Sequence, residues 1–109
     1  SWKSAVAARD ESGGLIDMVS DKEIIQAYEM LAEKEGVFAE PASAASVAGL
    51  LKLIKQQYFK KANLNDGSYK IVCILTGHGL KDPERAIKTV KPPKAMRADL
   101  KAVIKEIGY

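Results

Sequence analysis

Hydrophobic residues recur at spacings of three and four positions in two segments of the chain, which places them on one face of a helix. The first segment opens with a capping box: the Ser20 hydroxyl can accept from the amide of Glu23 while Glu23 reaches back, and Gly36 closes the helix. The second follows Pro41, which a first helical turn tolerates because its missing amide is not needed there. The predicted core positions are Ile24, Ile25, Tyr28, Leu31 and Ala32 in the first helix and Val47, Leu50, Leu51, Ile54 and Tyr58 in the second.

Three further helices are expected. Residues 2–11 are rich in helix formers and stop at Gly13. Asp82 stands before a proline and predicts the N-cap of a short helix. Residues 94–108 predict a terminal amphipathic helix with Lys and Arg opposite an apolar face, and that face consists of Met96, Leu100, Val103, Ile104 and Ile107.

Short apolar stretches between these helices predict strands at residues 15–19, 37–40 and 71–75. The last is a continuous apolar run without polar alternation, which is typical of a strand covered on both faces in a parallel sheet. Residues 60–68 predict a polar loop. Alternating helices and strands predict an α/β fold, with a small parallel sheet of about three strands flanked by helices. We expect residues 1–109 to form a single α/β unit whose open sheet edge a partner chain or missing segment covers.

The turn Thr76-Gly77-His78-Gly79 follows the third predicted strand. Open α/β sheets bind ligands at the carboxyl ends of their strands, so the turn is a candidate ligand site. Its two glycines match neither a dinucleotide fingerprint nor a P-loop, and a plain strand-to-helix turn explains them equally well. Glu40 ends another predicted strand, where its carboxylate either pairs with a helix amide or faces a bound group. The small residues 42–49 admit tight helix packing or a ligand.

Composition removes several classes of function. Seventeen Lys and Arg against fourteen Asp and Glu give a net charge of +3, and these charges are interspersed rather than gathered into a nucleic-acid-binding face. The one histidine and the one cysteine, Cys73, offer no metal-ligand spacing, and a lone thiol in an apolar run predicts a buried residue in a reducing compartment. No apolar run is long enough to span a bilayer, so we expect a cytoplasmic protein. The first residue is Ser1 rather than Met, which suggests a piece of a longer chain.

Two motifs together carry a resemblance to a known family. Residues 40–45 read EPASAA, and residues 75–82 read LTGHGLKD. SWK at the start, ESGG after the first helix and VSDKEI at the second strengthen the match. From Ser1 to about Val90 the chain resembles the carboxyl-terminal part of the threonine synthase family. These enzymes belong to the pyridoxal-phosphate-dependent fold type II, or tryptophan-synthase-β, superfamily. The EPASAA element also resembles threonine and serine dehydratases, whereas LTGHGLKD is more specific.

The resemblance implies a role for each motif residue. Thr76 is expected to hydrogen-bond the pyridine nitrogen of pyridoxal 5'-phosphate, and a hydroxyl there leaves that nitrogen largely unprotonated. Glu40 is expected near the ring edge, and Gly77 and His78 to help wall the site. The family's reaction converts O-phosphohomoserine and water to threonine and phosphate. The implied fold is part of the large domain of a fold type II enzyme.

The chain lacks two elements that the family requires. No lysine stands in the context of the Schiff-base lysine, and no Ser/Thr/Asn/Gly-rich loop is present for the cofactor phosphate. We therefore expect no catalytic residue in this chain, no covalent attachment of the cofactor to it, and no activity of the chain alone. Its expected partners are the remainder of the parent polypeptide or a partner chain, in a homo-oligomer. Two alternatives stay open: a dehydratase fragment, and a stand-alone, non-catalytic α/β interaction module.

Overall fold

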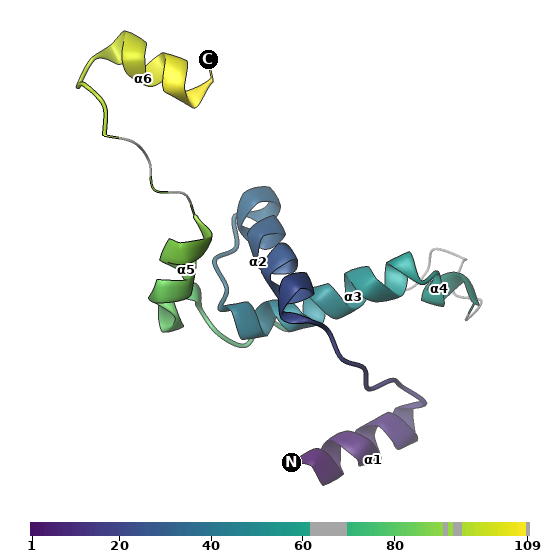
Figure 1. Ribbon diagram of the computed structural model, residues 1–109. Coiled ribbons are helices and arrows are strands. Elements are labelled where there is room, and N and C mark those ends of the chain that lie inside the picture. Colours follow the sequence, from purple (N-terminus) through teal and green to yellow (C-terminus); the bar gives the residue numbers. More distant parts are fainter. Residues whose placement is uncertain (62–69, 91, 93–94, 109) are drawn as a thin grey trace.

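The computed structural model describes residues 1–61, 70–90, 92 and 95–108. These residues form helices and connecting segments in an elongated arrangement of 61 × 34 × 19 Å (Figure 1). The elements, in chain order, are α1 (Trp2–Ser12), α2 (Asp21–Glu35), the 3-10 turn η1 (Pro41–Ala44), α3 (Ala45–Lys55), α4 (Tyr58–Lys61), the 3-10 turn η2 (Gly79–Lys81), α5 (Pro83–Thr89) and α6 (Leu100–Ile107).

Helix α2 begins and ends as its sequence predicts. The Ser20 hydroxyl accepts from the Glu23 amide at 3.3 Å, and the Glu23 carboxylate accepts from the Ser20 amide at 2.7 Å. This capping box satisfies amide groups that have no partner inside the helix. Gly36 ends the helix in the left-handed conformation, with φ of 66°.

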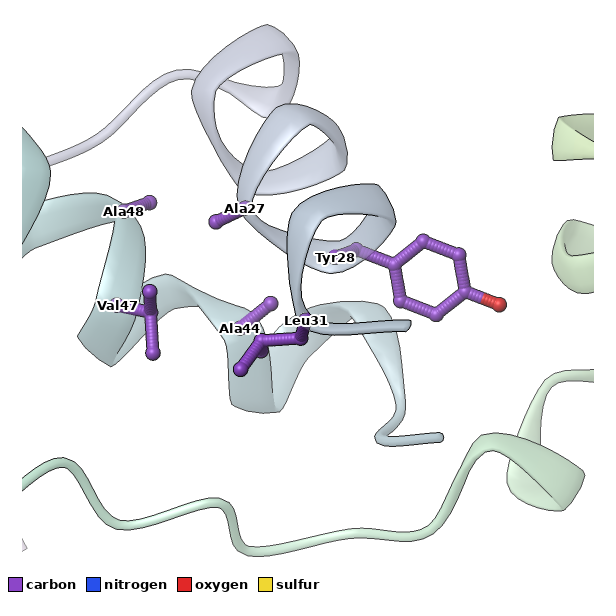
Figure 2. Packing of buried hydrophobic residues seen from close by; sticks show 6 residues of the cluster. All are labelled: Ala27, Tyr28, Leu31, Ala44, Val47 and Ala48. Atoms are coloured by element: carbon purple, nitrogen blue, oxygen red, sulfur yellow. The ribbon is translucent and has the colours of Figure 1, made fainter. Parts of the chain in front are cut away.

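The core of the described structure lies where α2 packs on η1 and α3. Small side chains let the helices approach closely, since Ala27 and Ala44 are both fully buried. Figure 2 shows the cluster, which contains Ala27, Tyr28, Leu31, Ala44, Val47 and Ala48. Ile54 is instead 52% exposed, because α3 projects beyond α2 (Figure 1). The predicted second helix is also interrupted: α3 ends at Lys55, and Gln57 takes a positive φ before α4.

Tyr28 connects this core with the start of α5. Burial raises the pKa of the Tyr28 hydroxyl, and the negative charge of Asp82 raises it further. The Asp82 carboxylate accepts from the Arg85 amide at 3.1 Å, which confirms the predicted N-cap.

Helices α1 and α6 lie away from the core and carry no buried residue (Figure 1). Within the predicted helical range 94–108, the helix starts at Leu100, where the Asp99 carboxylate accepts from the Ala102 amide, and residue 94 is outside the described residues. The apolar face of α6 is solvent-exposed, as Leu100 at 73% illustrates. Among the helices that the structure describes, none has both the length and the apolarity needed to cross a membrane.

The prediction of a parallel sheet is wrong. No strand occurs in residues 1–61, 70–90, 92 or 95–108, and the three predicted strands are extended segments without a ladder. A strand leaves its backbone groups unpaired until a neighbouring strand accepts and donates, and the described residues bring none alongside residues 15–19 or 71–75. The predicted loop with its Asn65-Asp66-Gly67 turn lies largely in residues 62–69, outside the described residues.

One isolated bridge is present in the described residues, between the segment at residues 37–40 and the turn that follows residues 71–75. It joins Ala39 to His78, and its direction is antiparallel rather than parallel. The bridge is the feature that assembles the candidate site.

Candidate site at the Thr76 turn

The antiparallel bridge brings the two sequence motifs together. The Glu40 amide donates to the Gly77 carbonyl at 2.9 Å, and the Gly79 amide donates to the Phe38 carbonyl at 3.0 Å. These two bonds fix the end of the segment before η1 against the turn that follows the apolar run. The residues predicted from sequence, Glu40, Thr76, Gly77 and His78, therefore lie in one place.

Ser43 links the turn to the first turn after Glu40. Its hydroxyl oxygen lies 3.0 Å from the Thr76 hydroxyl oxygen and accepts from the Gly77 amide at 2.7 Å. Ser43 is only 4% exposed, whereas Thr76 is exposed. The network thus runs from a buried serine to a hydroxyl at the surface of the described structure.

The Glu40 carboxylate lies against the same turn. The Glu40 side chain is 14% exposed, and its Oε2 pairs with Lys81 Nζ at 2.8 Å. A Cβ added at Gly77 would collide with this carboxylate, so the close approach needs glycine at that position. The first alternative for Glu40, pairing with a helix amide, is not what the structure has: the carboxylate pairs with a lysine.

His78 packs against Phe38 and bonds to the turn that follows it. Its ring meets the Phe38 ring edge to face, with centroids 5.5 Å apart and an interplanar angle of 80°. Its Nδ1 accepts from the Leu80 amide at 3.2 Å, so in the neutral ring the proton is assigned to Nε2. A Cβ at Gly79 would collide with the Phe38 ring. Both glycines of the turn are therefore required by close neighbours and not only by chain flexibility.

An apolar groove of about 500 Å³ lies next to the site. Residues 15–19, α3 and residues 71–73 line it, with Leu15, Gly49 and Val72 among the contributors. Lys52 holds the first of these segments in place: its Nζ lies 2.7 Å from Asp17 Oδ2 and donates to the Met18 carbonyl at 2.7 Å. The hydrogen bond from Lys52 is the main reason why the pKa of Asp17 is lowered.

Sequence reasoning missed the parts of Ser43 and Lys81. In the sequence, Ser43 is one of several small residues near a helix start, and Lys81 is one residue of the LTGHGLKD motif. Their contacts join positions 33 and 41 residues apart, as Ser43 to Thr76 and Lys81 to Glu40. No local pattern encodes such pairs, although both residues belong to the motifs that carry the resemblance.

Sequence comparison identifies the family of the chain. The model of the family described as "Pyridoxal-phosphate dependent enzyme" matches residues 3–77, so the chain belongs to that family. The cofactor of the family is pyridoxal phosphate.

More specific relatives are proteins named threonine synthase, which confirms the resemblance given by the two motifs. The Halalkalibacterium halodurans protein is 54% identical over 90 residues, covering 83% of this chain and 24% of the relative. The Methanocaldococcus jannaschii protein is 45% identical over 106 residues, covering 94% of this chain and 25% of the relative. For Synechocystis sp. the identity is 46% over 110 residues, covering 99% of this chain and 27% of the relative. The chain thus spans about a quarter of the length of these relatives.

The residues at the turn fit one side of a pyridoxal phosphate site. Thr76 is an exposed residue with a hydroxyl, a group that can donate a hydrogen bond to a pyridine nitrogen. Glu40 and Phe38 pack closely against the backbone at residues 77 and 79, so the turn is held in shape by its neighbours. The fit concerns the ring only, because no phosphate cradle is recognised in this sequence.

Proposed function

We propose that this chain is the carboxyl-terminal portion of the large domain of a threonine synthase. The intact enzyme would convert O-phosphohomoserine and water to threonine and phosphate. The observation that carries the proposal is the meeting of Glu40 and Thr76, from two motifs more than thirty residues apart, at one hydrogen-bonded turn. The threonine synthases among the relatives, at 43% to 54% identity, support this function over a dehydratase.

In the proposed site each residue has a distinct task. Thr76 donates a hydrogen bond to the ring nitrogen, which keeps that nitrogen unprotonated because a hydroxyl is a far weaker acid than a carboxylic acid. Glu40, neutralised by Lys81, lies at the ring edge, and Gly77 and His78 form the wall beside it. Pyridoxal phosphate supplies an electron sink for substrate carbanions when it is bound. The residues of this chain would hold the ring of pyridoxal phosphate in position and keep its ring nitrogen unprotonated.

The remainder of the enzyme would complete the site and cover the groove. Large apolar side chains of the extended segments are open to solvent here, for example Met18 at 79% and Val72 at 84%. Monomeric proteins rarely leave such surfaces uncovered. We propose that the rest of the polypeptide covers residues 15–19 and 71–75, and that this assembly takes place in the cytoplasm within a homo-oligomer. The chain alone would then release no phosphate from O-phosphohomoserine.

The experiment compares Thr76→Val with Thr76→Ser in the full-length protein that contains this segment. Valine keeps the shape of threonine without its hydroxyl, so we expect turnover of O-phosphohomoserine to fall about tenfold or more, whereas serine keeps the hydroxyl and should retain most of the activity. Phosphate release measures the rate, and circular dichroism checks the fold. Equal activity of the two variants would contradict the proposed role of Thr76. Preference of the wild type for threonine over O-phosphohomoserine would indicate a dehydratase instead.

A further inference from the structure

The buried hydroxyl of Ser43 has a restricted choice of partners. A hydroxyl offers one proton and two acceptor lone pairs. One lone pair takes the Gly77 amide proton at 2.7 Å. The Ser43 proton itself needs an acceptor, because an unpaired donor at 4% exposure costs free energy. Among the described residues, the Thr76 hydroxyl oxygen at 3.0 Å is the acceptor that the structure supplies.

The need of the buried Ser43 proton for an acceptor sets the direction of the hydrogen bond between Ser43 and Thr76. If Thr76 donated to Ser43, the buried Ser43 proton would have no acceptor in the described structure. If Ser43 donates, every group is satisfied and the Thr76 proton is free. Because Thr76 is an exposed residue, a group from outside the described residues can reach it and accept this proton.

The backbone holds Ser43 firmly in place for this task. Its amide donates to the Glu40 carbonyl at 3.0 Å, and its carbonyl accepts from the Ser46 hydroxyl at 3.1 Å. The same Ser46 hydroxyl lies 3.2 Å from the Ile74 carbonyl, so its one proton is shared between two carbonyls and links the start of α3 to the segment that precedes Thr76. The distance between Ser43 and Thr76 is therefore fixed by contacts on both sides.

We propose that Ser43 is a positioning residue, which makes the Thr76 hydroxyl a hydrogen-bond donor toward the cofactor ring. The chain of bonds runs from the Gly77 amide to Ser43, from Ser43 to Thr76, and from Thr76 to the ring nitrogen. This inference rests on the proposed function, since it takes the ring nitrogen as the final acceptor. Its new content is that Ser43 determines which way the Thr76 proton points, without touching the cofactor.

The test uses the full-length protein loaded with pyridoxal phosphate labelled with ¹⁵N in the ring. Two quantities are measured in a double-mutant cycle of Ser43→Ala and Thr76→Val: the ¹⁵N chemical shift and the dissociation constant of the cofactor. We expect each single change to move the ring resonance toward that of an unbonded pyridine nitrogen and to weaken binding about threefold to tenfold. The double variant should match Thr76→Val alone, because Ser43 acts only through Thr76.

Two further variants separate positioning from mere loss of stability. Ser20→Ala removes a capping hydroxyl that shares no bond with Ser43, so it should lower stability and leave the ring resonance unchanged. Ser43→Cys has a weaker donor of similar size, and it should move the resonance in the same direction by a smaller amount. If Ser43→Ala does not fold, Ser43→Cys replaces it in the measurements of the ring resonance and of cofactor binding.

The outcomes distinguish this inference from the proposed function. An unchanged resonance in Thr76→Val would overturn the proposed contact with the ring nitrogen. A shift in Thr76→Val with none in the Ser43 variants would leave that contact standing and overturn the role of Ser43. Additive effects of the two changes would also overturn it, because they would mean that Ser43 acts independently of Thr76.

Discussion

The contact of α2 with η1 and α3 and the extended run at residues 71–75 both present apolar side chains, but they bury them to different extents. In the helical region, Ala27 and Ala44 are completely buried. In the extended run, Val72 is 84% and Ile74 is 71% exposed. A run whose pattern is typical of a strand buried on both faces thus leaves Val72 and Ile74 open to solvent, while Cys73 and Leu75 pack against the helical core.

The difference shows which part of the fold this chain can complete by itself. A helix satisfies its backbone from within and needs only one partner face, and α3 provides that face for α2. A strand of a parallel sheet needs neighbours on both edges and covering layers on both faces. Those neighbours are absent from the described residues, in a chain that spans about a quarter of its relatives' length.

The largest expected effect comes from truncating the helical core. Leu31→Ala removes a side chain that is 7% exposed, and we expect it to lower the free energy of unfolding by about 2–4 kcal/mol, enough to abolish most helical circular dichroism of the isolated chain. Ile74→Ala should change the isolated chain by less than about 0.5 kcal/mol, because Ile74 contacts little here. In the full-length protein Ile74→Ala should cost about 1–3 kcal/mol, measured by urea denaturation.

The effects of Leu31→Ala and Ile74→Ala test the contrast between the buried helical core and the exposed run at residues 71–75. Equal, small effects of Ile74→Ala in the isolated chain and in the full-length protein would mean that the extended run stays uncovered in the enzyme. Such a result would contradict the proposed covering of this run by the rest of the polypeptide.

A smaller effect on stability is expected for a substitution at Gly49, and its sign should differ between the isolated chain and the full-length protein. It lies inside α3, and a Cβ there would meet nothing within 4 Å. Gly49→Ala should therefore stabilise the isolated chain by about 0.5–1 kcal/mol, since glycine weakens a helix interior. Gly49 also lines the apolar groove, so in the full-length protein the added methyl group should cancel or reverse the gain. Thermal denaturation of both forms measures the two signs, and a gain of equal size in both would indicate an empty groove.

The smallest expected effect is the acid sensitivity of the α2 N-terminus. Hydrogen bonds from the Ser20 amide and hydroxyl lower the pKa of Glu23 in the folded chain. The stabilising contribution of Glu23 is therefore fully present above its unfolded value of about 4.3 and is lost as the pH falls through the lowered folded pKa. Helical circular dichroism between about pH 6 and pH 2 should fall less steeply in Glu23→Gln than in wild type.

The pKa of Asp17 is also lowered, mainly by the hydrogen bond from Lys52, so Asp17→Asn is the matched control for Glu23→Gln. Asp17→Asn should leave the acid sensitivity of α2 itself in place. If it removed that sensitivity and Glu23→Gln did not, the capping box would not be its source.

Local signals in the sequence determined the ends of α2 and the start of α5, although they did not predict the break between α3 and α4. The capping box at Ser20, the stop at Gly36 and the N-cap at Asp82 each act through atoms within a few residues, so the pattern alone locates the ends of α2 and the start of α5. The motifs around Glu40 and Thr76 likewise pointed to the family, which the family match and the relatives confirm.

Only the tertiary structure decided how the extended segments pair and which side chains meet at the turn. The apolar run at residues 71–75 has the composition of a strand, but composition cannot supply the neighbour that a strand must bond to. The antiparallel bridge from Ala39 to His78, and the hydroxyl pair of Ser43 and Thr76, depend on segments more than thirty residues apart. The contacts that begin and end a helix join residues close together in the sequence. The contacts that form the site join residues far apart in the sequence. For this reason the sequence predicted helix ends, whereas only the structure identified the hydrogen bonds of the site.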